Sequence, residues 1–362
     1  MARILHSADW QLGARLRFVP GDKGAQLRLD RFETLATIAA LAKERDVDAV
    51  LVSGDVFDDN AVGDDILQQT RDKLSLFSCP VLLISGNHDA ATAECALERL
   101  NPAGYGLDHV HVLLDTSPLT IGDTTYHPCP LARRHSYEDT CAHLKPVNEA
   151  GVHVVLAHGG AHEFSESATS PNLIDVKAII QKGYDYVALG DWHSPLKIDE
   201  RAWYSGTHEF YSRRERDPGH VLLVNIAKKG ALPQVETLRV GRVNKAHFER
   251  IIESGEDVAL LAEDMNALEM RSKTIATLSL EGALSMEDYT RLEALITTQS
   301  SEMLHLEVKR LEVTSRPSEE ELFSLQAPGF LQHALDELLA SEAPHAAESA
   351  RLLYRLIREN AQ

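Results

Sequence analysis

The sequence predicts an α/β fold with more than one domain, and three patterns along its 362 residues indicate this. Through the first half, short apolar runs of strand length alternate with segments whose apolar residues recur at helical spacing. Beyond residue 193 the pattern is typical of strands, and after residue 242 the alternation of strand and helix starts again. A chain of this length commonly folds as two or three domains, which agrees with the restart.

Short apolar runs are the predicted strands of the first half, and they lie at residues 2–6, 48–52, 81–85, 152–157 and 185–189. Helical spacing predicts the intervening helices, which lie at residues 30–45, 64–77, 92–100 and 174–182. Strand-like segments follow at residues 203–206, 221–226 and 235–240, and a turn at 228–230 joins the last two. We expect all of these elements to form one domain over residues 1–241.

A second, smaller α/β domain is predicted over residues 242–315. Its strands are expected at residues 247–252, 274–280 and 304–313, and its helices at residues 256–268 and 286–298. Residues 316–362 are expected to form a linker and two amphipathic helices, at residues 330–339 and 346–357. The last helix has a short apolar side formed by Leu352, Leu353 and Leu356, so we expect it to dock on a partner surface.

Charge and cysteine content restrict the functional classes. The chain has 55 acidic and 36 basic residues, a net charge of −19, which is unusual for a protein that grips phosphate backbones over a wide surface. Any contact with nucleic acid is therefore expected to be local, mediated by metal or shared with a basic partner.

The four cysteines form no C-x-x-C pair, which indicates reduced thiols in the core. No signal peptide precedes the first strand and no apolar run reaches membrane length, so we expect a cytoplasmic protein without membrane contact.

The residues at the ends of the five first-half strands are all types that can bind metal ions. In open α/β sheets the carboxyl ends of the strands carry the functional site. Asp9 with Gln11, and Asp191 with His193, are two residues apart, so on extended backbone both side chains of a pair point to one side. The sequence therefore predicts a metal site formed by Asp9, Gln11, Asp55, Asn87, His158, Asp191 and His193.

Each of these residues alone has an ordinary explanation, with Asp9 or Asp55 as a turn or capping residue and His158 as a core histidine. The ordered series D-x-Q, GDxxD, GNHD, a histidine at a strand end and GDxH is not explained by packing needs. The series resembles the motifs of the metallophosphoesterase superfamily, which are D-x-H, GDxxD, GNH(D/E), a lone histidine and GHxH. This resemblance implies an αββα sandwich, in which two sheets lie between helices, and hydrolysis of phosphate esters.

A closer resemblance is to the double-strand-break repair nucleases of that superfamily, the SbcD-type nuclease subunits. It is carried by ILHSADWQLG at residues 4–13, YDYVALG at 184–190 and WYSGT at 203–207, and it covers about residues 1–240. The resemblance implies that residues 242–315 form a capping domain that orients DNA. It also implies that the C-terminal helices dock on an SbcC-type coiled-coil ATPase, and that the protein is a homodimer associated with the nucleoid.

Two positions depart from the family motifs, because Gln11 and Asp191 stand where histidines are usual. Gln11 offers only a neutral oxygen, so we expect the first metal to be bound loosely. Asp191 adds a third carboxylate beside Asp9 and Asp55, and oxygen-rich sites favour manganese or magnesium over zinc. We therefore expect two divalent ions, with manganese foremost and magnesium as the alternative.

Motif matching implies how these ligands are shared. One metal would take Asp9, Gln11, Asp55 and His193, and the other would take Asp55, Asn87, His158 and Asp191. Hydroxide between two such ions attacks phosphorus in line while the ions neutralise the phosphate oxygens. His88 is the catalytic histidine by position, and we expect it to protonate the departing sugar oxygen, with Asp89 or Asp9 as its orienting partner. Asp58 is better suited to support a ligand or to cap a helix.

Arginines near the strand ends are candidates for DNA contact. They are Arg15, Arg17, Arg133, Arg134, Arg213 and Arg214. Such pairs are more often ordinary surface residues, but three arginine-bearing loops at one edge could form a basic rim that receives a DNA backbone. Trp10 and Trp192 lie beside the ligand motifs and could stack on a splayed base, although core packing is the preferred interpretation for both.

The sequence therefore predicts a metal-dependent DNA exonuclease and endonuclease that acts in repair or DNA-end processing with an SbcC-type ATPase. Two alternatives remain open. One is a two-metal phosphodiesterase or phosphatase that acts on nucleotides or phosphoproteins, which leaves the added domain and helical tail unexplained. The other is a catalytically weakened scaffold for the ATPase, and the retention of Asp55, Asn87, His88, His158 and His193 argues against it.

Overall fold

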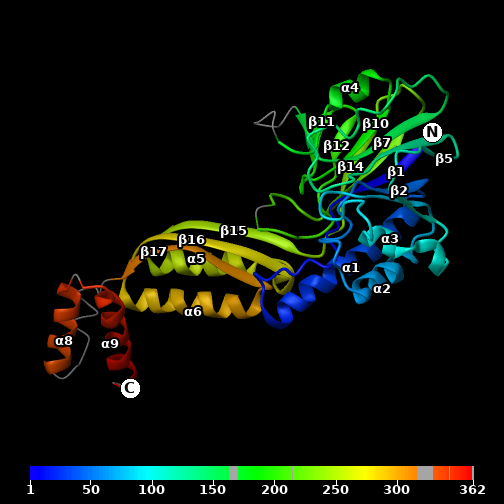
Figure 1. The fold of residues 1–362 in the computed structure, drawn as a ribbon. Coiled ribbons are helices and arrows are strands. Elements are labelled where there is room, and N and C mark those ends of the chain that lie inside the picture. Colours follow the sequence, from blue (N-terminus) through cyan, green and yellow to red (C-terminus); the bar gives the residue numbers. More distant parts are fainter. Residues whose placement is uncertain (163–169, 214, 316–328, 342, 361–362) are drawn as a thin grey trace. The chain divides into compact units, whose positions relative to one another are not determined.

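The computed structural model describes residues 1–162, 170–213, 215–315, 329–341 and 343–360. The chain divides into two compact units, Met1–Val243 and Asn244–Gln362 (Figure 1). No helix within the described ranges is long and apolar enough to cross a membrane. All four cysteines are free thiols, and only Cys79 is not fully buried. The predicted linker at residues 316–328 lies outside the described ranges.

Two six-stranded sheets form the centre of the first unit. The first has the order β14-β13-β1-β2-β3-β4, with β1 to β4 parallel, and consists of β1 (Ala2–Ser7), β2 (Ala49–Val52), β3 (Val81–Ile84), β4 (Val110–Leu113), β13 (His220–Ile226) and β14 (Gln234–Arg239). The second has the order β11-β12-β10-β7-β6-β5, and consists of β5 (Leu119–Ile121), β6 (Thr124–Cys129), β7 (Val152–His158), β10 (Tyr186–Gly190), β11 (Leu196–Asp199) and β12 (Ala202–Tyr204). Strands β6, β7, β10 and β12 run parallel, so their carboxyl ends share one edge. A separate pair joins β8 (Gly160–Ala161) to β9 (Leu173–Ile174).

The alternation of side chains along each strand places the sheets between two layers of helices. Ile4 of the first sheet packs in one buried cluster with Tyr186 of the second, so these faces meet. Leu5 points the other way, toward helices α1 (Gly21–Glu44), α2 (Asp64–Leu74) and α3 (Ala96–Leu100). Val155 of the second sheet packs with α4 (Val176–Gln181) on the opposite outer face (Figure 1). The predicted αββα fold class is confirmed.

The second unit contains a three-stranded parallel sheet of order β15-β16-β17. Its elements are β15 (Asn244–Ile252), α5 (Gly255–Asn266), β16 (Thr274–Leu284), α6 (Met286–Glu302) and β17 (His305–Ser315). Leu278 of the sheet packs in one buried cluster with Leu261 of α5 and Leu292 of α6. The tail forms helices α8 (Gly329–Ala340) and α9 (Ala346–Asn360), which bury Leu335 and Tyr354 against each other.

Two parts of the first unit differ from the prediction. Helix α1 begins at Gly21 instead of residue 30, because its first turns contain Gly24 and polar residues that give no helical apolar pattern, and Pro20 provides no side-chain cap. Strands β4, β5, β6 and β11 and the two-residue strands β8 and β9 were not predicted, since they are short, partly buried or contain polar residues such as His127. In each case packing within the unit determines the helix or strand, although the local sequence pattern does not indicate it.

Candidate metal centre

The candidate site lies where the carboxyl ends of strands from both sheets meet. The strands β1, β2, β3, β7 and β10 end at or just before candidate ligands, which are Asp9, Asp55, Asn87, His158 and Asp191. The Ser53 hydroxyl donates to the Ala188 carbonyl over 3.0 Å and so ties the two sheets together at this edge. Residues far apart in the sequence therefore meet at the position where open α/β sheets place their sites.

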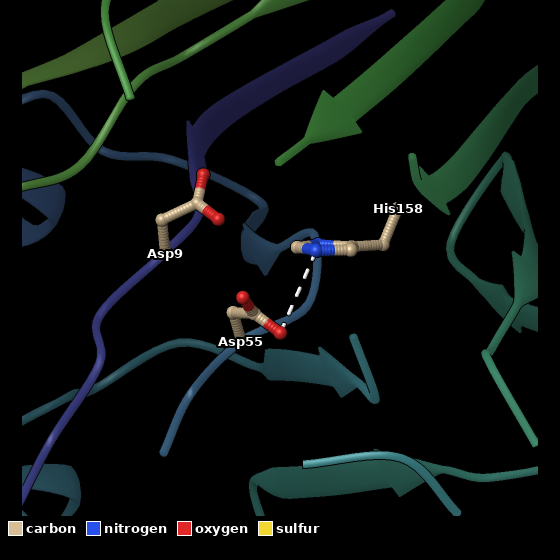
Figure 2. A group of neighbouring side chains, drawn as sticks. All are labelled: Asp9, Asp55 and His158. Carbon is tan, nitrogen blue, oxygen red and sulfur yellow. Dashed lines mark ion pairs between the residues drawn. The ribbon is translucent and has the colours of Figure 1, made fainter. Parts of the chain in front are cut away.

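Three of the predicted ligands form the buried centre of the site. Asp9, Asp55 and His158 are 2% exposed or less, and each offers a ligand atom within 4.8 Å of the others. Figure 2 shows their side chains converging from separate strands, with the ion pair between His158 Nε2 and Asp55 Oδ1 at 3.5 Å. Two carboxylates and an imidazole in this geometry are a donor set that suits a divalent cation.

The backbone at the site is held in an unusual conformation. Positive φ angles occur at four predicted ligands, which are Asp9 (53°), Gln11 (46°), Asp55 (54°) and Asp191 (103°). The expectation of extended backbone at Asp9, Gln11 and Asp191 is therefore wrong. Left-handed φ angles cost non-glycine residues about 1–3 kcal/mol each and are concentrated at functional sites. Here backbone hydrogen bonds hold the loops together, from Gln11 N to Asp55 O (2.9 Å) and from Leu12 N to Val56 O (2.9 Å).

Asp55 lies between two halves of the donor set. Its Oδ1 accepts a hydrogen bond from the His88 backbone N–H (2.9 Å) and faces His158, whereas its Oδ2 accepts from Gln11 Nε2 (2.7 Å). A Cβ on Gly86 would lie 2.1 Å from Asp55 Oδ1, so only glycine allows this close approach. Each carboxylate oxygen is thus directed at a different group of ligands.

Gln11 has an unsatisfied oxygen that fits a cation. The side chain is fully buried, and Oε1 has no hydrogen-bond partner in the described part of the chain. A buried polar atom without a hydrogen-bond partner is destabilising, and a bound ion or water would provide that partner. The neutral amide oxygen beside Asp55 is therefore available to coordinate a metal.

His158 is positioned by its Nδ1 atom, which hydrogen bonds to the Ser53 carbonyl over 2.8 Å. This contact requires a proton on Nδ1 and directs Nε2 toward Asn87 Oδ1 (2.8 Å) and Asp191 Oδ1 (3.8 Å). Burial lowers the pKa of His158, but the carboxylates of Asp55, Asp9 and Asp191 outweigh it and raise the pKa to about 9. Burial raises the pKa of Asp9 to about 6, although the two histidines oppose this shift.

We expect metal affinity to rise with pH, because His158 carries a proton at neutral pH that a metal must displace. With its pKa near 9, His158 releases one proton when the ion that it holds is bound, so the affinity for this Mn²⁺ should increase about tenfold per pH unit from pH 6 to 9. Below pH 6 protonation of Asp9 should make the dependence steeper. Calorimetry in two buffers of different ionisation heat measures the released proton. Equal affinity at pH 6.5 and 8.5 would contradict this expectation.

His193 and Asp191 complete the site on the side of the second sheet. His193 Nε2 lies 3.9 Å from Asp9 Oδ1, and its Nδ1 hydrogen bonds to Glu215 Oε1 over 2.8 Å. Burial lowers the pKa of His193, but Glu215 and Asp9 raise it above its usual value overall. The Asp191 backbone N–H donates to both Asp9 carboxylate oxygens (3.2 Å each), and its own side chain is 45% exposed. Glu215 lies outside every motif, so only the tertiary structure reveals it.

His88 is oriented by Asp58, and Asp89 has other partners. His88 Nδ1 hydrogen bonds to the Asp58 carbonyl over 2.8 Å and lies 4.0 Å from Asp58 Oδ1. The two oxygens of Asp89 accept from the backbone N–H groups of Gly86 (2.7 Å) and Phe57 (3.1 Å). Burial, with a contribution from Asp55, raises the pKa of Asp89 to about 7. Asp89 therefore links the loop that contains Gly86 to the loop that contains Phe57 through hydrogen bonds to both.

Arg31, a buried arginine that the motifs did not indicate, stabilises the loop that contains Asp9. Arg31 of α1 is 1% exposed, and its guanidinium donates to the carbonyls of Asp9 (3.4 Å) and Trp10. It also donates to the carbonyls of Glu209 (3.0 Å) and Phe210 (2.9 Å). Arg31 thus fixes the first ligand loop to the segment that leads to Glu215.

Three of the six candidate DNA-binding arginines share a cavity of about 410 Å³. Arg15, Arg17 and Arg213 line it together with Asp58 and Tyr211. The other candidates are elsewhere: Arg133 and Arg134 are exposed after β6 and do not line this cavity, and Arg214 lies outside the described residues.

The two tryptophans beside the ligand motifs differ in their exposure to solvent. Trp10 is fully buried, as expected, but the core packing expected for Trp192 is wrong because it is 51% exposed.

Comparison with known proteins identifies one family and a similar solved structure. The family model described as calcineurin-like phosphoesterase matches residues 2–195, which is more than half of the chain. The crystal structure of the protein TT1561 of Thermus thermophilus is similar at 13% sequence identity and a TM-score of 0.42. That match covers 66% of this chain and 99% of the other.

Proposed function

This chain belongs to the calcineurin-like phosphoesterase family of metal-dependent hydrolases, and from that premise we propose that it is a DNA phosphodiesterase. In this proposal it acts as an exonuclease and endonuclease in DNA repair or end processing. It works as a homodimer and as the nuclease subunit of a complex with an SbcC-type coiled-coil ATPase. The observation that carries the choice of DNA is the cavity lined by Arg15, Arg17 and Arg213, which includes Asp58, the partner of His88.

The donor atoms support two cation positions that share Asp55. Asp9, Gln11, Asp55 and His193 would hold one ion, and Asp55, Asn87, His158 and Asp191 the other. The carboxylates and amide oxygens outnumber the imidazoles, which favours manganese, with magnesium as the alternative. When bound, such ions supply a nucleophile from water near neutral pH and neutralise charge on the phosphate oxygens.

His88 is the group proposed to protonate the leaving oxygen. Its Nδ1 is engaged by the Asp58 carbonyl, so the ring is fixed and Nε2 is left for the substrate. The hydrogen bond from Tyr211 Oη to Asp58 Oδ1 (2.9 Å) holds this support in place. His88 is about 25% exposed at the side chain, which leaves it accessible from solvent beside a largely buried metal centre.

The arginine cavity supports a polyanionic substrate despite the net charge of −19. Arg15 and Arg17 are exposed, and Phe18 and Tyr211 add aromatic surface to the same cavity. Three arginines that line one cavity fit a local grip on a few phosphates. The exposed apolar side chains Phe330 (72%), Leu352 (49%) and Leu356 (45%) on the tail helices support docking of a partner.

The double variant Arg15→Ala/Arg17→Ala is expected to weaken DNA binding. We expect the KM for DNA to rise about tenfold while the affinity for Mn²⁺ stays unchanged, since neither residue contacts a ligand. The dependence of log Kd on log salt should become less steep by about 1–2, as phosphate contacts are lost. Arg45→Ala, directly after α1 and beside Glu236, is the control at an arginine that does not line the cavity. An unchanged KM and salt slope would contradict a DNA contact at this cavity.

The decisive experiment is hydrolysis by the purified full chain with Mn²⁺, on linear and hairpin DNA, with and without an SbcC-type ATPase. Cleavage of DNA in at least one of these conditions is the expected result. Hydrolysis of nucleotides or phosphopeptides while DNA stays intact would replace the proposal with the phosphodiesterase or phosphatase alternative. Bound Mn²⁺ without hydrolysis of any of these substrates would indicate the scaffold alternative.

A further inference from the structure

We propose that Tyr211 and Glu215 form a bracket that positions both functional histidines, His193 at the metal centre and His88 beside it. Neither residue belongs to a ligand motif, and both act through hydrogen bonds to other side chains. The inference rests on the proposed metal-dependent hydrolysis. It does not depend on DNA being the substrate, so its tests use metal binding and a small phosphodiester.

Glu215 forms the first arm of the bracket. Its side chain is almost completely buried, at 6% relative exposure for the residue. Oε1 accepts a hydrogen bond from His193 Nδ1 (2.8 Å), and Oε2 accepts from the Tyr211 backbone N–H (3.0 Å). With Nδ1 engaged, Nε2 is the nitrogen that is left on the side of Asp9, 3.9 Å from Oδ1. A carboxylate in this position fixes the tautomer and the ring orientation of a histidine ligand and increases its basicity.

Tyr211 forms the second arm. Its ring meets the His193 ring edge-on, with centroids 5.2 Å apart and an interplanar angle of 74°. Its hydroxyl donates to Asp58 Oδ1 (2.9 Å), and the Asp58 carbonyl accepts from His88 Nδ1 (2.8 Å). Tyr211 therefore contacts the metal-ligand histidine with its ring, and its hydroxyl holds Asp58, whose carbonyl in turn holds the proposed acid.

The base of the bracket is rigid. Arg31 donates to the carbonyls of Glu209 and Phe210, directly before Tyr211, and its guanidinium lies 5.4 Å from the Tyr211 ring centroid. The Glu209 carboxylate in turn accepts from the backbone N–H groups of Phe210 (2.8 Å) and Arg242 (2.6 Å). The segment before Tyr211 is therefore fixed by hydrogen bonds to Arg31 and to the Glu209 carboxylate. A side chain on such a fixed segment can position neighbouring side chains as accurately as catalysis requires.

Glu215→Gln tests the first arm through metal binding. Glutamine keeps the size of the side chain but replaces the charged acceptor of His193 with an amide. We expect the affinity for Mn²⁺, measured by calorimetry, to fall about 10–100-fold, with little change in the melting temperature of the metal-free protein. Glu200→Gln, at an exposed glutamate that pairs with Lys197, is the matched control. Wild-type affinity in Glu215→Gln, or a loss of affinity that only follows unfolding, would overturn this arm.

Tyr211→Phe tests the second arm, since it removes the hydroxyl and keeps the ring on His193. Mn²⁺ affinity should stay within about twofold, while kcat on a dinucleoside monophosphate, a small phosphodiester with an alcohol leaving group, should fall about tenfold without a change in KM. The same substitution in the His88→Ala background should have no further effect, because it acts through His88. Tyr137→Phe, at a tyrosine that is 80% exposed, is the control.

A second measurement of this arm needs no activity. In the neutral form of the His88 ring, the ¹⁵N chemical shifts should report a single Nδ1–H tautomer in the wild type and a mixture in Tyr211→Phe, whereas the form that donates a proton from Nε2 is the imidazolium. If those shifts are identical in the two proteins, or if Tyr211→Phe lowers kcat equally with and without His88, Tyr211 does not position His88. A tautomer change in a protein whose wild type hydrolyses nothing would contradict the proposed function and leave the bracket in place.

Discussion

Replacing Asp55 with asparagine is expected to lower the affinity for Mn²⁺ by at least about 100-fold and to abolish hydrolysis. Loss of an outer partner of a ligand alone costs about 10–100-fold, and Asp55 is proposed to contact both ions directly. Its two oxygens face different groups, Oδ1 toward His158 (3.5 Å) and Oδ2 toward Gln11 (2.7 Å). Asparagine has only one oxygen and no charge, so it can satisfy at most one of these sides.

The fold of the Asp55→Asn variant should survive, which makes the result interpretable. Asparagine has the same shape and keeps an oxygen for the His88 backbone N–H that now donates to Asp55 Oδ1. We would measure Mn²⁺ stoichiometry and affinity by calorimetry and the melting temperature of the metal-free protein. Asp72→Asn, at an exposed aspartate of α2, is the matched control. Wild-type stoichiometry and affinity in Asp55→Asn would show that Asp55 is not the shared ligand.

His88→Ala is expected to lower kcat on DNA by about 10²–10⁴-fold and to leave Mn²⁺ affinity and folding unchanged. General acid catalysis contributes about this much, and the His88 ring is held by Asp58 instead of by the Asp9, Asp55 and His158 cluster. The loss should be much smaller on bis(p-nitrophenyl) phosphate, because nitrophenolate leaves without needing a proton. A substrate-dependent loss of this kind separates a proton donor from a residue that only binds phosphate.

The controls for His88→Ala are direct. His333→Ala, at a histidine whose side chain is 78% exposed on α8, should match the wild type when no ATPase is present. Equal loss on both substrates would indicate phosphate binding in place of proton donation. Equal activity of wild type and His88→Ala on DNA would exclude a catalytic role for His88.

The strand ends could be predicted because their signals are local. A buried strand of four to seven residues is a continuous apolar run, so its last residue and the polar residue after it are visible in the sequence. That reasoning located Asp9, Asp55 and His158, which the structure places within 4.8 Å of one another. The α/β class follows from the same alternation of strands and helices, whereas the αββα layers were implied by the resemblance to the family.

The remaining features depend on contacts between distant segments, which no local pattern records. Glu215 and Tyr211 gain their roles from His193 and Asp58, which come from other loops of the unit. The left-handed φ angle at Asp9 is maintained by the neighbouring loop, which accepts the hydrogen bond from Asp9 N at Gly54 O (3.1 Å). Similarly, the choice of Asp58 over Asp89 as the partner of His88 depends on how two turns pack together.

The contact between Asp9 and the Asp191 backbone, 182 positions apart in the sequence, has a consequence for the order of assembly. Donor atoms that come from two separate sheets exist as a set only after both sheets have formed and packed. A cation therefore cannot nucleate this fold in the way that zinc organises a small finger domain. The apoprotein is the immediate precursor of the loaded protein, so a chelator should produce a folded, inactive form that recovers as fast as ions diffuse back, without a refolding delay.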